Sequence, residues 1–234
     1  MSVFVIAALT GEPGTAGDLV DAAAASGANA VVIGHGAGLE PELFELKAHT
    51  ESRGLEFIAA PHDVESLWFL VRKVKVRHLK IASGDTGNVP LLTAAIESGL
   101  PLIVSAGSTS AEDIHASLRA LTDYAGRADV TFLHSPETPE QTNLGTIYKL
   151  TEQGYRAGYA SHTDGIDDVL AAVAIGAQMV EKGLTLAPSA KAAVGPTQFR
   201  QMWDRIQNIC DALGNDSKAI MPGEERRGLP GVFR

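Results

Sequence analysis

Residues 156–186 read RAGYASHTDGIDDVLAAVAIGAQMVEKGLTL, and this stretch decides the fold. Its two ends are short apolar runs of strand length. Between them lie apolar residues at helical spacing: Val169, Leu170, Val173 and Ile175. A strand, a helix and a parallel strand make a βαβ unit. His162 follows the first strand and Gly183 lies at the end of the second, which are the positions where α/β barrels carry their chemistry.

The same alternation extends over the rest of the chain. The predicted strands before this stretch cover residues 3–9, 29–33, 55–60, 78–82, 102–105 and 130–134. The predicted helices outside it cover residues 18–26, 41–53, 64–74, 89–98, 111–124, 141–153 and 197–213. Eight strand–helix units predict a single (β/α)₈ TIM barrel over residues 1–214, followed by a C-terminal arm over residues 215–234.

The composition excludes several classes of function. The chain carries 28 acidic and 19 basic side chains, a formal charge of −9, and no basic cluster, which argues against nucleic acid as a partner. The N-terminal segment is apolar but lacks a basic start, so we expect neither a signal peptide nor a membrane span. A single cysteine, Cys210, allows no internal disulfide and favours a cytoplasmic location. The expected partner is a small anionic or sugar-derived substrate, and a homodimer stays open.

Several segments resemble the sialic acid synthase (N-acetylneuraminate synthase) family. Residues 158–165 and 176–186 resemble its Gly-Tyr-Ser-Asp-His-Thr and Gly-Ala-x-x-Ile-Glu-Lys-His-Phe-Thr motifs. Residues 57–63, FIAAPHD, resemble Phe-Leu-Ser-Thr-Pro-Phe-Asp, and residues 78–114 resemble the block from Lys-Ile-x-Ser-Gly-(Asp/Glu) to Ser-(Thr/Ala)-Gly. GEERRG, residues 223–228, resembles the arm that leads to an antifreeze-like domain, which we expect to be absent because the chain stops at Arg234.

The resemblance implies a transferase of carbohydrate biosynthesis. The family condenses phosphoenolpyruvate with an N-acetylated aldose in an aldol-type reaction, and it uses a divalent metal. Carried over residue by residue, it implies catalytic roles for Lys80, Asp85, His162 and Glu181, and substrate binding by Ser83 and Ser105. His62 and His134 also follow predicted strands, and we expect them to bind substrate. An ammonium and hydroxyl groups suit a phosphate or carboxylate, and an acid can move a proton.

Among the departures from the family motifs, two concern the metal and the anion. The family's Lys-Phe-Gln on the second strand is here Val32-Ile33-Gly34, which removes one anion-binding lysine. Of the two histidines that hold the family's metal, the first matches His162 and the second falls on Gly183. One histidine should hold a first-row metal poorly. A metal site rebuilt from His35, His62, His134 and His162 stays open, and so does the cofactor.

Three functions therefore compete. The first is a divergent enzyme that forms a carbon–carbon bond between phosphoenolpyruvate or a related small anion and an aldose-type substrate. The second is a non-catalytic barrel that binds a sugar or a partner protein. The third is a lysine-dependent aldolase with Lys80 as nucleophile. In each case we expect Lys80 to be partly exposed at a strand end.

Overall fold

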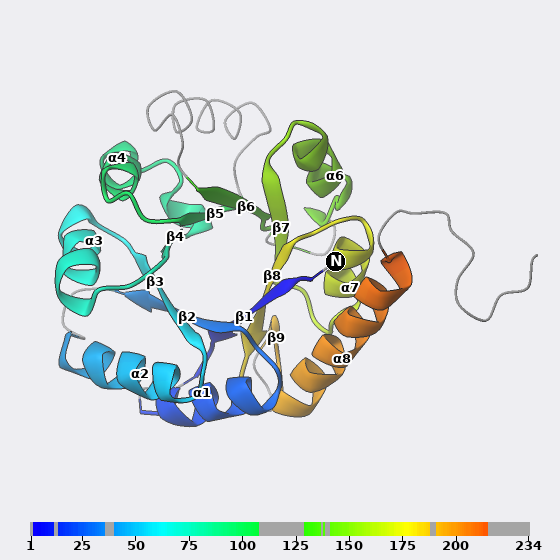
Figure 1. Ribbon diagram of the computed structural model, residues 1–234, viewed down its shortest axis with the longest axis horizontal. Coiled ribbons are helices and arrows are strands. Elements are labelled where there is room, and N and C mark those ends of the chain that lie inside the picture. Colours follow the sequence, from blue (N-terminus) through cyan, green and yellow to red (C-terminus); the bar gives the residue numbers. More distant parts are fainter. Residues whose placement is uncertain are drawn as a thin grey trace, which may run out of the picture.

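The structure, a computed structural model, describes residues 2–11, 14–35, 40–107, 129–136, 138, 141–187 and 191–214. Within these residues eight parallel strands form a ring that closes through the pairing of β1 with β8, and helices surround it (Figure 1). The strands are β1 (Phe4–Leu9), β2 (Ala30–His35), β3 (Glu56–Pro61), β4 (Leu79–Ile81), β5 (Leu102–Ala106), β6 (Val130–His134), β7 (Arg156–Ser161) and β8 (Met179–Leu184). The predicted (β/α)₈ TIM barrel is confirmed.

The helices follow the strands in the predicted order. They are α1 (Ala16–Ala25), α2 (Glu40–Ser52), α3 (Val64–Phe69), α4 (Val89–Glu97), α6 (Gly145–Glu152), α7 (Asp167–Ala174) and α8 (Pro196–Leu213). The helix predicted over residues 111–124 lies outside the described residues, as does the predicted arm over residues 215–234. None of the helices described is both long and apolar enough to span a membrane.

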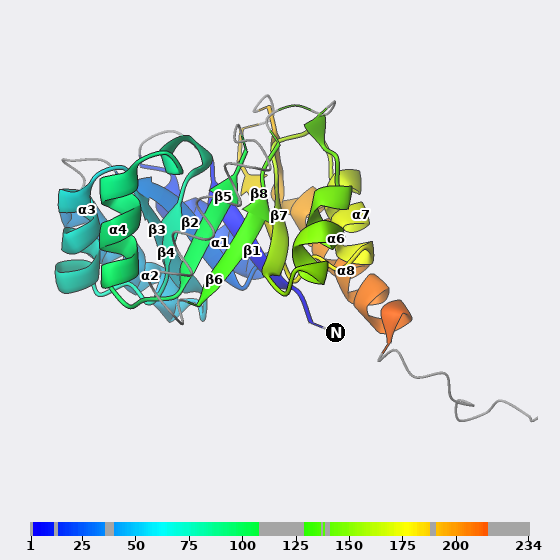
Figure 2. The same ribbon diagram turned by 90° about the horizontal axis from the view of Figure 1, so that it is seen from above.

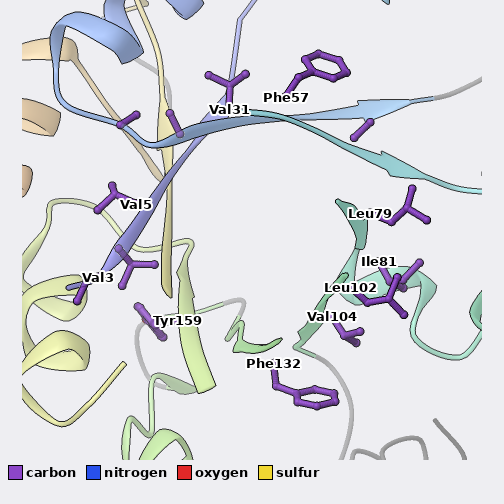
Figure 3. Close-up of a cluster of buried hydrophobic side chains, with 14 of the residues drawn as sticks. Val3, Val5, Val31, Phe57, Leu79, Ile81, Leu102, Val104, Phe132 and Tyr159 are labelled. Carbon is purple, nitrogen blue, oxygen red and sulfur yellow. The ribbon is translucent and has the colours of Figure 1, made fainter. Parts of the chain in front are cut away.

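Each strand is buried on both faces, as parallel strands in barrels are. One set of side chains faces the helices and forms the larger core, in which Val5, Val31, Phe57, Leu79, Val104 and Phe132 lie (Figure 3). The alternate set fills the inside of the barrel with Ile6, Ala30, Val32, Ile58, Ile103, Leu133 and Ala160. The strands run tilted between the two ends of the barrel (Figure 2).

Local structure departs from the sequence prediction at four places. The predicted helix over residues 64–74 is α-helical only to Phe69 and continues as a π-helix, η1 (Leu70–Val74). The predicted loop after β4 contains a 3₁₀ turn, η2 (Ser83–Asp85). A two-residue strand, β9 (Ala193–Val194), pairs with the end of β8 and was not predicted. Ile175, counted among the apolar residues of its predicted helix, lies just after the end of α7 and is 39% exposed.

The close approach of β7 and β8 depends on Gly158. A β-carbon built there would lie 2.3 Å from the carbonyl oxygen of Met179 and 2.6 Å from Leu133 Cδ2. Neither neighbour can move without shifting the barrel wall or its packed interior. A residue larger than glycine therefore does not fit at position 158 unless its neighbours move.

We expect Gly158→Ala to lower the free energy of unfolding by about 1–3 kcal/mol, the usual cost of overpacking a core. Gly17→Ala is the matched control, because Gly17 lies in α1 with nothing within 4 Å of its added methyl group. That change should be neutral or stabilising, since alanine favours helix. Urea unfolding of both variants measures this, and equal stability of the two would contradict the space argument.

Candidate active site

An ion pair crosses the inside of the barrel. Lys80 on β4 and Glu181 on β8 face inward, and Lys80 Nζ lies 2.5 Å from Glu181 Oε1. Both residues are buried, with 9% and 3% of their surface exposed. The expectation that Lys80 is partly exposed is therefore wrong: the interior of the barrel, and not its rim, receives the side chain. Buried charges of this kind require their partners, because neither can be hydrated.

Two buried polar atoms on inward-facing residues have no partner among the described residues. Glu181 Oε2 and Ser105 Oγ are both buried without a hydrogen bond. Ser105 faces inward from β5, the strand next to Lys80. Unpaired buried polar atoms are uncommon in folded proteins and call for an explanation. A polar ligand between Lys80, Ser105 and Glu181 would satisfy them.

A second group of polar residues lies above, where β4, β5, β6 and β7 end. A β-carbon built on Gly107 would lie 2.5 Å from the carbonyl oxygen of Ser135 and 3.1 Å from Ser83 Cβ, so Gly107 packs closely against both residues. Ser135 Oγ and His162 Nε2 share a hydrogen bond of 3.1 Å. Ser83, Gly107, Ser135 and His162 thus form a continuous edge at the mouth of the barrel.

His62 and Asp85 form a separate pair at the same mouth. His62 follows β3, Asp85 ends η2 after β4, and Nδ1 lies 2.7 Å from Asp85 Oδ2. The side chain of His62 is 51% exposed and that of Asp85 is 21% exposed. The pair is therefore accessible from solvent, unlike Lys80 and Glu181 below it.

The structure does not bring His134 to this site. Its ring packs 6.1 Å from that of Tyr159, which belongs to the core facing the helices, and Nε2 bonds to the carbonyl oxygen of Thr142 2.8 Å away. Burial lowers the pKa of His134 below its usual value, an effect that the Thr142 carbonyl partly offsets. The neighbouring Ser135 faces the mouth instead, and a count of alternate residues from the inward-facing Leu133 would have found it.

Ser161 and Thr163, on either side of His162, are fixed by hydrogen bonds from the helix-facing side of the barrel. Asp168 on α7 accepts hydrogen bonds from Tyr159 (2.8 Å), Ser161 (2.8 Å) and Thr163 (2.7 Å). Lys182, which is fully buried, donates to Ser161 Oγ at 2.9 Å and to the carbonyl oxygen of Thr163. Burial lowers the pKa of Lys182, while Asp168 and Asp164 act against this. We call these five residues (Tyr159, Ser161, Thr163, Asp168 and Lys182) the outer network, and sequence patterns gave no sign of it.

The residues present do not fit the family's two-histidine metal site. Gly183 offers no ligand, and a β-carbon there would lie 2.9 Å from that of Ala193 on β9. His162 Nε2 already bonds to Ser135. No group of three or more His, Cys, Asp and Glu residues in the described part of the chain could hold a metal ion. The side chain of His35, one of the four histidines considered for a rebuilt site, lies outside the described residues.

A hollow also lies at the opposite end of the barrel. It is lined at the start of the strands by residues that include Phe4, Ile58, His78, Thr131 and Arg156. Barrel enzymes place their chemistry at the carboxyl ends of the strands, so we assign the active site to the mouth with Lys80 and His162.

Comparison with known proteins bears on this assignment. The NeuB family model matches residues 37–218. The chain belongs to the NeuB family. It is 30% identical to the N,N'-diacetyllegionaminic acid synthase of Campylobacter jejuni over 193 residues, and 29% identical to the N-acetylneuraminate-9-phosphate synthase of Homo sapiens over 190 residues. These alignments cover 78% and 77% of this chain, which spans 58% and 52% of the length of the two relatives.

The fold is similar to the solved structure of a sialic acid synthetase. The sialic acid synthetase of Leptospira borgpetersenii, crystallised in complex with citrate, is 27% identical and superposes with a TM-score of 0.82. The match covers 94% of this chain and 87% of that one. The protein is therefore a sialic-acid-synthase-like member of a carbohydrate-biosynthesis family. The predicted roles of Lys80, Ser83, Asp85, Ser105, Glu181 and the histidines stay predictions.

We expect Lys80→Met to lower the free energy of unfolding by about 3–5 kcal/mol, because it leaves Glu181 buried without its partner. The double variant Lys80→Met/Glu181→Leu removes both charges and should recover most of this loss. Lys47→Met is the control, since Lys47 and Glu51 form a surface pair at 2.8 Å that should contribute less than about 1 kcal/mol. Urea unfolding of the wild type and the three variants measures these differences in stability. A single variant as stable as the control would mean that the buried pair is not a constraint on the fold.

A second prediction concerns His134 and pH. Its pKa is lower in the fold than the usual 6.5, so below pH 6.5 the unfolded chain takes up a proton that the folded one does not. Stability should therefore fall as the pH drops below 6.5, and less steeply in His134→Gln. Urea unfolding of both proteins on either side of pH 6.5 measures the difference. Parallel pH dependence would show that His134 does not contribute.

Proposed function

We propose that this protein joins phosphoenolpyruvate, or a related small anion, to an aldose-type sugar through a new carbon–carbon bond. The observation that carries the proposal is the inward cluster of Lys80, Ser105 and Glu181, in which buried polar atoms have no partner in the described chain. Membership of the NeuB family and the synthase relatives support the reaction class.

Lys80 can still bind an anion although it is paired. An ammonium group has three donors, and Glu181 Oε1 takes one of them. The two other N–H donors of Lys80 and the hydroxyl of Ser105 can bind an anionic oxygen. Because the charge of Lys80 is already balanced by Glu181, the attraction is weaker than that of a lone lysine. We therefore expect weak binding of a small anion alone.

Glu181 suits the sugar partner. Its free oxygen, Oε2, is an acceptor and matches a hydroxyl or amide N–H donor of an aldose. A cluster with donors on one side and an acceptor on the other favours a site shared by an anion and a polyol. In a site that bound only an anion, the negative charge of Glu181 would oppose binding.

The other two candidate functions have less support. A Schiff-base lysine must be a neutral amine, whereas Lys80 lies in an ion pair with Glu181. Lys182 is fully buried behind the barrel wall, where a keto substrate has no access. A purely structural barrel would be better served by apolar residues in place of a buried ion pair, which contributes little net stability.

Ser105→Ala tests the anion site. Ser105 Oγ has no partner in the described chain, so its loss should leave the fold intact while weakening phosphoenolpyruvate binding about five- to tenfold, the effect of one hydrogen bond. Calorimetry with phosphoenolpyruvate, citrate and inorganic phosphate measures it. Ser52→Ala, at an exposed serine that ends α2, is the control and should bind as wild type.

The reaction itself is measured as phosphate release from phosphoenolpyruvate with a panel of N-acetylated hexosamine aldoses. Wild-type protein that binds none of the anions would contradict the proposed function. Equal binding by wild type and Ser105→Ala would move the anion site away from the inward cluster.

A further inference from the structure

The His62–Asp85 pair has the geometry of an acid–base dyad. A carboxylate can only accept a hydrogen bond, so Nδ1 of His62 donates to Asp85 across 2.7 Å. This fixes Nε2 as the ring nitrogen that exchanges a proton, the arrangement that an orienting carboxylate produces in catalytic triads. Half of the His62 side chain is exposed, so a substrate can reach it.

Nε2 faces the mouth of the barrel above Lys80. Ile58 faces inward, and alternate residues put Ala60 and His62 on the same side. A β-carbon built on Gly34, the inward position at the end of β2, would lie 3.6 Å from His62 Nε2. Because Ala59 pairs with Leu79, Ala60 is level with Lys80, and His62 lies one pleat higher, about 7 Å along the strand direction.

Two residues at this place differ from the family motifs quoted above. His62 stands where the motif has Phe, and Gly34 stands where the strand-two motif has Gln. The histidine introduces a proton donor, and the glycine leaves space in front of it. The same chain has Gly183 where the second metal-binding histidine would be. A new polar group has thus appeared in a site whose metal ligands are incomplete.

We infer that His62, oriented by Asp85, is a general acid that activates the sugar carbonyl in place of a metal ion. The inference rests on the proposed function and adds to it the group that makes the carbonyl electrophilic. In this role His62 is the catalytic residue, because its Nε2 would donate directly to the carbonyl oxygen of the sugar. Asp85 is a positioning residue.

The proton moves from His62 to the sugar oxygen as the new bond forms. The π electrons of the enol form the carbon–carbon bond to the aldehyde carbon, the C=O π pair moves onto the aldehyde oxygen, and that oxygen takes the proton from Nε2. The N–H bond breaks and leaves neutral imidazole. Water then adds to the resulting oxocarbenium carbon and gives one proton to solvent, which leaves a hemiketal that carries the phosphate. The C–O bond to phosphate breaks as the keto group forms, the hemiketal hydroxyl proton leaves with the phosphate, and a proton from solvent returns to Nε2.

The other charged groups nearby are already engaged. Asp63, the next residue, accepts from the backbone and hydroxyl of Ser66 at the start of α3. Lys80, one pleat below, pairs with Glu181. Within the described chain, Asp85 is therefore the carboxylate that bonds to the ring of His62.

The test measures phosphate release in EDTA, with phosphoenolpyruvate and the aldose panel, for wild type, His62→Gln, His62→Phe and Asp85→Asn. We expect both His62 variants to lose about 10²–10⁴-fold in kcat, the usual contribution of a general acid. Phosphoenolpyruvate binding by calorimetry should stay within about threefold, since binding is assigned to Lys80 and Ser105. Wild-type kcat should be lower at high pH, as for any reaction that needs a general acid, whereas His62→Gln should lack this dependence.

His49→Gln is the matched control. His49 Nε2 also lies 2.7 Å from a carboxylate, that of Asp21, but the two residues lie on the outer helices α2 and α1. This variant should keep wild-type kcat. Nitrogen-15 NMR of the imidazoles gives a second measurement: His62 should carry its proton on Nδ1 when neutral, and Asp85→Asn should shift it toward Nε2.

Two results would overturn the inference. They are His62 variants with wild-type kcat, and wild-type turnover that EDTA abolishes and Mn²⁺ restores. Both require a wild type that turns over an aldose, so they differ from failure of the proposed function, in which wild type releases no phosphate with any aldose of the panel.

Discussion

The ion pair between Lys80 and Glu181 is the constraint on which the site depends. Its two residues are 101 positions apart and meet only because β4 and β8 belong to one closed ring. Inside the barrel they are surrounded by apolar and small side chains such as Ile58, Ile103 and Ala160. Among these side chains, the unpartnered atoms Glu181 Oε2 and Ser105 Oγ are the polar groups that a ligand could satisfy. This supports the proposal that the substrates bind in the upper half of the barrel.

The mouth above the ion pair divides into two sides with different chemistry. Ser83, Ser135 and His162 form a hydrogen-bonding edge over β4 to β7. His62 and Asp85 lie over β3 and β4, where Asp85 follows the family motif and His62 departs from it. On the inference drawn above, the group that activates the carbonyl is where the chemistry of this mouth has changed.

Sequence patterns predicted the barrel because apolar runs of strand length alternate with helical spacing, and local composition controls both. They predicted the position of Lys80 and Glu181 at strand ends but neither their burial nor their pairing, since a contact over 101 residues has no local signal. His134 faces the helices because its place in the pleat, one residue before Ser135, decides its direction. The strand β9 and the π-helix η1 were not predicted for a similar reason. Tertiary packing, and not local propensity, determines whether such short elements form.

The outer network has a consequence for how this site can change over time. Asp168 and Lys182 hold the loop that carries His162 from the side of the helices, so the loop conformation does not depend on what the barrel encloses. Residues inside the mouth can then be exchanged one at a time without collapse of the loop. In this barrel the network that fixes the loop faces the helices, whereas the proposed reacting groups face the interior. Such a separation lets a metal ligand be lost and a proton donor be gained without loss of the fold.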